Sequence, residues 1–134
     1  MSLQESVAVA NAALDQREVI IGASPFLHFY TGAMPANCAA AATGVQLVVM
    51  DLPADWMAAA AAGSKDLAGL WAVKSNAAGL AGYFRLYNNA QTICHQQGTI
   101  TGLGGGGDME MDDPNIPNNK WVIVDSYTLT SLSL

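Results

Sequence analysis

The chain has 134 residues, of which 51% are hydrophobic and 12% are charged; this is enough apolar side chain for one continuous core, and it predicts a single domain. The 11 acidic and 5 basic side chains give a formal net charge of -6 at pH 7, which repels phosphate backbones and argues against nucleic-acid binding. No run approaches the roughly 20 apolar residues of a membrane span, and Glu5, Asp15 and Glu18 fall where a signal peptide would be basic or uncharged, so neither a membrane protein nor a secreted one is predicted.

The N-terminal residues carry the pattern of a helix. Ser2 and Glu5 have the spacing of a capping box, in which side chains bond the backbone N–H groups at a helix start. Apolar residues recur at helical spacing in the order Leu3, Val7, Ala10 and Leu14. We therefore expect a helix over 3–16, within an N-terminal arm of residues 1–20. Because the stripe is narrow, the helix should dock on one surface, either its own sheet or a neighbouring subunit, and its leucines and valine are candidate interaction residues.

Beyond Gly22 the sequence alternates short β-type runs with turn residues. The predicted strands cover 26–30, 45–52, 70–73, 82–87, 92–101, 109–111 and 121–132. Between them, the alanine-rich run 54–62 starts after a proline and stops before a glycine, which predicts one short additional helix. The pattern is typical of a mostly-β fold, and we expect residues 21–134 to form a two-sheet antiparallel sandwich, either jelly-roll or immunoglobulin-like.

The clearest local unit is a hairpin over 82–101. Strict alternation places Phe84 and Leu86 on one face of its first strand and Tyr83, Arg85 and Tyr87 on the other. An Asn-Asn turn then leads into the returning strand, so the pair should be antiparallel. Tyr83 and Tyr87 are expected outside, where they suit a platform for a sugar ring; core packing and subunit contact are the simpler explanations of the same residues.

Few residues have the spacing that catalysis or metal binding needs. Cys94 and His95 are adjacent in a predicted strand and should point to opposite faces, so they cannot act as a nucleophile and base pair. Cys38 and Cys94 are expected to be reduced thiols. Asp108, Glu110 and Asp112 follow a glycine run and are weak candidates for calcium, against a simpler reading as a solvated acidic face. No enzyme activity, catalytic residue, zinc site or cofactor is predicted.

Several segments in order resemble a family of small structural proteins of tailed bacteriophages. These segments are FLHFYTGAMPANCAAA, LPADWMAAAAAGSKDLAG, AGYFRLYNNAQTICHQQGTI, GGGGDMEMDDPNI and VDSYTLT. The resemblance implies a virion component made in the host cytoplasm, and an acidic β protein of this size looks like a capsid cement or decoration protein. Such proteins are usually homotrimers that bind the major capsid protein and brace the shell. A neck or tail component and a carbohydrate-binding module on the virion are the alternatives.

Overall fold

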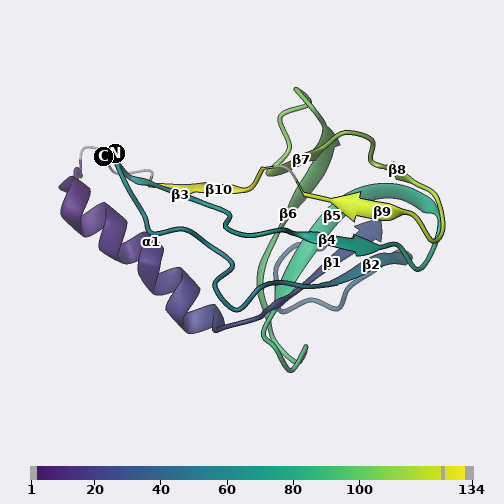
Figure 1. The fold of residues 1–134 in the computed structure, drawn as a ribbon, viewed down its shortest axis with the longest axis horizontal. Coiled ribbons are helices and arrows are strands. Elements are labelled where there is room, and N and C mark those ends of the chain that lie inside the picture. The colour runs from purple at the N-terminus through teal and green to yellow at the C-terminus, as the bar shows by residue number, and fades with distance from the viewer. Residues whose placement is uncertain (1–2, 125, 132–134) are drawn as a thin grey trace.

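A computed structural model of the chain describes residues 3–124 and 126–131 and is mostly β, with one helix among these residues (Figure 1). The elements in chain order are α1 (Val7–Ile21), β1 (Phe26–Thr31), β2 (Gln46–Asp51), β3 (Ser64–Asp66), β4 (Ala72–Lys74), β5 (Gly79–Tyr87), β6 (Cys94–Gly102), β7 (Met109–Met111), β8 (Asn115–Ile116), β9 (Trp121–Ile123) and β10 (Thr128–Thr130). Figure 1 shows α1 at one end of the molecule, alongside β3 and β10.

The strands form one large sheet and two ribbons. The main sheet has the order β2-β1-β5-β6-β7, and β8 pairs with the start of β5. The ribbons pair β10 with β3 and β4 with β9. The mostly-β prediction and the antiparallel β5–β6 hairpin are confirmed, whereas β6 and β7 pair in parallel and a two-sheet sandwich is not confirmed.

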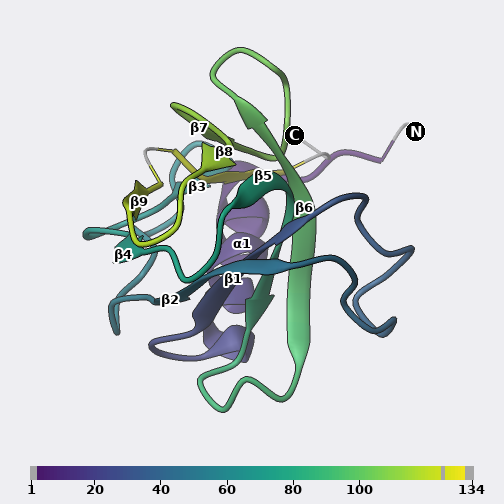
Figure 2. The ribbon, with the colours of Figure 1, turned by 90° about the vertical axis from the view of Figure 1, so that its right-hand side faces the viewer.

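One face of the main sheet supplies the core. Leu27 lies opposite Leu86, and Phe29 lies opposite Phe84, so these apolar side chains share a face. Aromatic rings connect this face to the ribbons, since Tyr127 meets the Phe84 ring at 5.5 Å between centroids. The chain of rings continues from Tyr127 to Trp71 and Trp56, at 5.7 and 6.1 Å. The ribbons therefore pack against the sheet through large buried side chains, and Figure 2 shows β4 and β9 together on one side of β5.

The short helix expected over 54–62 is not formed. Met57 bridges Leu67, and Ala61 bridges Ser64, so the alanine-rich run is the first arm of a tight hairpin whose second arm is β3. The turn residues Ala62 and Gly63 both have positive φ, at 52° and 78°, as a type I′ turn requires. Burial of Trp56 and Met57 in the core outweighs the helix propensity of alanine.

The single strand expected over 121–132 is divided between two ribbons. β9 pairs with β4, and β10 pairs with β3. The buried positions change phase between them, because Val122 and Val124 are buried before the break and Tyr127 after it. A continuous strand would send Val122 and Tyr127 to opposite faces. Leu132 lies outside the described residues.

The N-terminal helix exists but is shifted from the expected 3–16. Its N-cap is Ser6, whose Oγ accepts the Val9 N–H at 3.2 Å; Ser2 lies outside the described residues. The helix runs five residues beyond the predicted end, to Ile21, where Gly22 takes φ 91°. Its inner face buries Ala10, Leu14 and Ile21.

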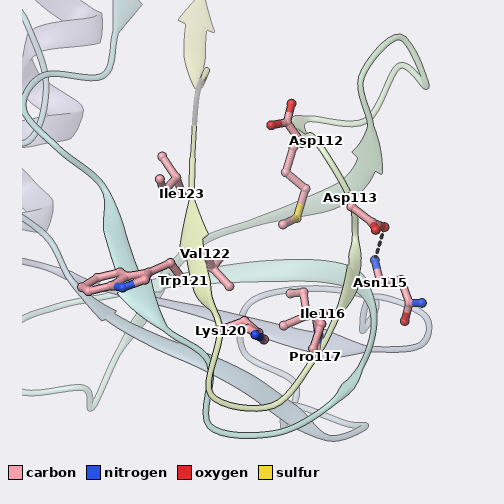
Figure 3. A pocket seen from close by; sticks show the side chains of 10 residues that line it. Asp112, Asp113, Asn115, Ile116, Pro117, Lys120, Trp121, Val122 and Ile123 are labelled. Carbon is pink, nitrogen blue, oxygen red and sulfur yellow. Dashed lines mark hydrogen bonds between the residues drawn. The ribbon is translucent and has the colours of Figure 1, made fainter.

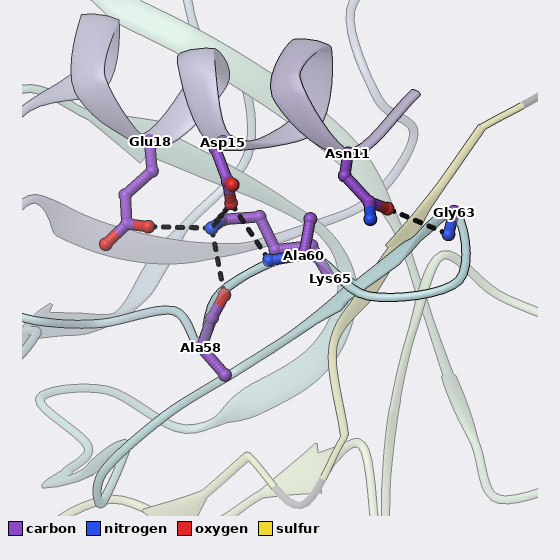
Figure 4. A network of polar contacts seen from close by, with 7 residues as sticks. All are labelled: Asn11, Asp15, Glu18, Ala58, Ala60, Gly63 and Lys65. Carbon is purple, nitrogen blue, oxygen red and sulfur yellow. Dashed lines mark hydrogen bonds and ion pairs between the residues drawn. The ribbon is translucent and has the colours of Figure 1, made fainter. Parts of the chain in front are cut away.

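A polar network fastens α1 to the hairpin (Figure 4). Lys65 in β3 is buried, and its Nζ lies 2.6 Å from Asp15 Oδ1 and 2.8 Å from Glu18 Oε1. The same ammonium donates to the Ala58 carbonyl at 2.8 Å, so all three of its N–H bonds have acceptors. Asn11 Oδ1 accepts the Gly63 N–H at 2.9 Å. An unpaired buried ammonium would cost several kcal/mol, so this network fixes where the helix sits.

Candidate functional site

The second face of the main sheet is polar, and most of it is buried. We call this the polar face; its residues are His28, Tyr30, Tyr83, Arg85, Tyr87, Cys94 and Gln97. Opposed pairs place them together, since His28 faces Arg85, Tyr30 faces Tyr83, and Gln97 faces Arg85 across the strands. Polar side chains in such a position require partners.

The segment between β1 and β2, residues 32–45, supplies many of those partners and is called the cover loop. Tyr83 Oη donates to the Thr43 carbonyl at 2.6 Å and accepts the Thr43 N–H at 2.9 Å. Arg85 Nη2 donates to the Asn37 carbonyl at 3.2 Å, and Gln97 Nε2 donates to the Pro35 carbonyl at 2.8 Å. The cover loop therefore lies across β5 and β6.

The expectation that Tyr83 and Tyr87 form an exposed platform is wrong. Tyr83 is fully buried, and its ring stacks on Tyr30 at 5.1 Å between centroids. Tyr87 is half-buried and contacts the His28 ring at 4.5 Å. The alternation that placed them on the outer face is correct, but a strand pattern does not show that a distant loop covers that face. A sugar ring has no access to Tyr83.

His28 is buried at the centre of a hydrogen-bond network. Its Nε2 lies 2.8 Å from Gln91 Oε1, an acceptor, so Nε2 carries the proton. Its Nδ1 then accepts from Gln46 Nε2 or from Tyr30 Oη, each at 3.0 Å. Burial lowers the pKa of His28, and the bond to Gln91 only partly opposes this. The neutral ring is the form that this network stabilises.

The two cysteines lie at one end of the polar face. Cys94 lies opposite Tyr87, and Cys38 follows Asn37 in the cover loop, which Arg85 contacts. Burial raises the pKa of Cys94 to about 12, and interaction with the Cys38 thiol adds to the shift. Both thiols are free and half-buried. No short-range sequence signal joins them, because they come from separate elements.

The candidate calcium ligands do not converge. Asp108 Oδ2 accepts the Thr99 N–H at 3.0 Å and its hydroxyl at 3.2 Å, while Glu110 Oε2 accepts the Gly106 N–H at 3.1 Å. These carboxylates hold the glycine-rich turn between β6 and β7, and Asp112 is exposed. Among residues 3–124 and 126–131, no three His, Cys, Asp or Glu side chains are grouped closely enough to hold a metal ion.

A cavity of about 260 Å³ lies between β9 and residues 111–117 (Figure 3). β9 pairs with β4 along its other edge. Val122 and Ile116 form apolar walls, and Asp113 Oδ1 is occupied by the Asn115 N–H at 2.9 Å. The indole of Trp121 points away from the cavity in Figure 3 and carries Lys74 Nζ over its ring at 5.8 Å. The cavity's lining residues hold no nucleophile and base pair.

The solvent side of α1 carries exposed apolar side chains together with the polar residue Gln16. Val9, Val19 and Ile20 are 53, 68 and 64% exposed. Val9, Ala13 and Ile20 follow one line along the helix, and Ala12 and Val19 lie beside it. We call these five residues the outer helix face. The expected contact residues divide differently: Leu14 is buried within the fold, whereas Leu3 and Val7 are exposed, and their contact role stays a prediction.

Comparisons with protein-family models, curated proteins and solved structures gave no match. Within the described residues, no helix is both long and apolar enough to cross a bilayer.

Proposed function

We propose that this chain is a structural subunit of a tailed-phage particle, a cement or decoration protein that assembles as a homotrimer on the head shell and contacts the major capsid protein. The observation that carries the proposal is the outer helix face. Its three large apolar side chains are more than half exposed, and the helix already has a buried inner face and a polar network that hold it in place. A helix that is apolar on two sides is suited to a partner on the second side.

The charge pattern supports assembly in the same way. Arg17 is the only basic residue in α1, and the two acidic residues, Asp15 and Glu18, are directed to Lys65. None of the five residues of the outer helix face is charged, and Arg17, four residues after Ala13 and three before Ile20, borders it. A low density of charged side chains is typical of the cores of protein interfaces. The proposal that the assembly is a phage particle rests on the resemblance to phage structural proteins.

Mass spectrometry and electron microscopy of purified phage particles test the proposal. A copy number that matches the capsomers of the shell supports a cement protein. A few copies per particle would instead favour the neck or tail alternative. Absence from particles made by cells that express the chain would refute both. A cement protein should also raise the temperature at which heads release DNA, compared with heads that lack it.

A further inference from the structure

The cover loop is held over β5 and β6 by two backbone carbonyls that come just before Cys38. The Pro35 carbonyl accepts from Gln97 in β6, and the Asn37 carbonyl accepts from Arg85 in β5. The Asn37 side chain also accepts the Ala40 N–H at 3.0 Å, which closes a turn around Cys38. The turn that carries Cys38 is therefore fixed against the end of the sheet where β6 begins.

Cys94 begins β6 and lies on the same face of the sheet. It is opposite Tyr87, one same-face position beyond the Arg85–Gln97 pair. The Cys38 thiol contributes to the raised pKa of Cys94, so the two side chains are within interaction range, and both residues are half-buried. The Cys94 thiol donates to the Gln96 carbonyl at 3.4 Å. Nearby, the buried Nε of Arg85 has no hydrogen-bond partner. The hydrogen bonds at this end of the polar face are therefore incomplete.

From this geometry we propose that Cys38 and Cys94 are a redox-sensitive pair whose disulfide locks the cover loop to the main sheet. A disulfide such as oxidised glutathione is the oxidant. The Cys38 thiolate attacks one glutathione sulfur and releases one reduced glutathione. The Cys94 thiol then loses its proton and attacks the Cys38 sulfur, which releases a second reduced glutathione. Two protein thiols are oxidised and one glutathione disulfide is reduced, so atoms and electrons balance.

The redox state of the Cys38–Cys94 pair should follow the redox environment of the protein. The reducing cytosol keeps it as two thiols, and an oxidising exterior converts it to the disulfide. The raised pKa of Cys94 makes it a slow nucleophile, so oxidation should be gradual and should accelerate with alkaline pH. The disulfide would close a ring from 38 to 94 that includes β1's partner strands, and such long rings gain most stability from closure. This inference does not depend on the proposed function.

The test uses the full-length reduced protein with excess oxidised glutathione, and matched Cys38→Ser and Cys94→Ser variants. We expect the monomer to lose two hydrogens by intact mass, with a Cys38–Cys94 peptide in the digest. Cys94→Ser should retain one glutathione adduct on Cys38, and Cys38→Ser should form its adduct on Cys94 more slowly. Thermal unfolding of the oxidised protein should shift upward by roughly 5 °C or more. Stable glutathione adducts on both cysteines, disulfide-linked dimers in place of the ring, or a lower melting temperature on oxidation would each overturn the proposal.

Discussion

Tyr83 ties the cover loop to the main sheet through a single hydroxyl group. That hydroxyl both donates to and accepts from Thr43, at 2.6 and 2.9 Å. Tyr83→Phe removes both bonds, but Thr43 is exposed and its backbone can bond water instead. We expect a loss of about 1–2 kcal/mol in the free energy of unfolding, measured by urea denaturation, and faster hydrogen exchange in residues 32–45.

Tyr87→Phe is the matched control for this prediction. The Tyr87 hydroxyl lies 3.5 Å from the Tyr30 hydroxyl, which is long for an O–H···O bond. The hydroxyl also interacts with the Arg85 guanidinium, but it makes no bond to the cover loop in residues 32–45, so its removal should leave hydrogen exchange in that loop unchanged. An equal effect of the two substitutions would show that the Tyr83 hydroxyl does not hold the cover loop.

His28 makes the polar face sensitive to acid. Burial lowers the pKa of His28 in the folded state. In the unfolded chain its pKa is about 6.5, so as pH falls the unfolded chain takes up a proton before the folded one does. The stability from neutral His28 is therefore complete above pH ~6.5 and is lost as pH falls below it. We expect urea midpoints to decrease between about pH 7 and pH 5, before most carboxylates titrate.

His28→Gln is the control that isolates this effect, since glutamine can hydrogen-bond but does not titrate in this range. The variant should be less stable at neutral pH, yet its urea midpoint should stay flat from about pH 7 to pH 5. A slope equal to that of the unchanged protein would assign the acid sensitivity to other groups. Asp15, whose pKa is lowered first by its bond to Lys65, loses its contribution only at lower pH.

The hairpin that contains the 54–62 run offers a substitution that should stabilise the protein if the hairpin forms and destabilise it if the run is a helix. Ala62 has φ 52°, a conformation that costs a non-glycine residue about 1–2 kcal/mol. Ala62→Gly should therefore raise the free energy of unfolding by roughly 0.5–1 kcal/mol, after the entropy gained by the unfolded chain is subtracted. In a helix the same change would lower it by about 1 kcal/mol.

Gly63→Ala is the matched opposite change, because Gly63 has φ 78° in the same turn. It should destabilise by about 1–2 kcal/mol. Urea denaturation of both variants gives the comparison. A stabilising Gly63→Ala, or a destabilising Ala62→Gly, would contradict the type I′ turn.

The same hairpin illustrates which elements a sequence can predict. The β5–β6 hairpin follows from periodicity over many residues and was predicted. The stripe predicted for α1 was only half right, because Ala10 and Leu14 are buried whereas Leu3 and Val7 are exposed. The 54–62 run failed because alanine favours a helix by only a few tenths of a kcal/mol per residue, whereas burying Trp56 stabilises by several times that amount. Burial of Tyr83 by the cover loop, and the meeting of Cys38 with Cys94, depend on contacts between segments far apart in the chain, which local patterns do not contain.

In the molecule as a whole, one face of α1 packs against the rest of the chain and the other is exposed to solvent. Its inner face and its polar residues are used within the chain, through Leu14 and the Lys65 network. The outer helix face has no such use among the described residues, and its spacing allows a second helix to pack along it. If copies of the chain associate there, one substitution on this face should separate them without unfolding the monomer.

Ile20→Glu tests this, since Ile20 is 64% exposed and a charge there is harmless in the monomer. In an assembly each copy would bury an unpaired carboxylate at a cost of several kcal/mol, which weakens association by about 100-fold or more. Light scattering coupled to size-exclusion chromatography should then show trimers for the unchanged chain and monomers for Ile20→Glu, with equal circular dichroism. Leu103→Glu, at a similarly exposed leucine in the turn after β6, is the control and should remain trimeric. A monomeric unchanged chain, or equal masses for all three proteins, would show that the outer helix face does not join copies of this chain.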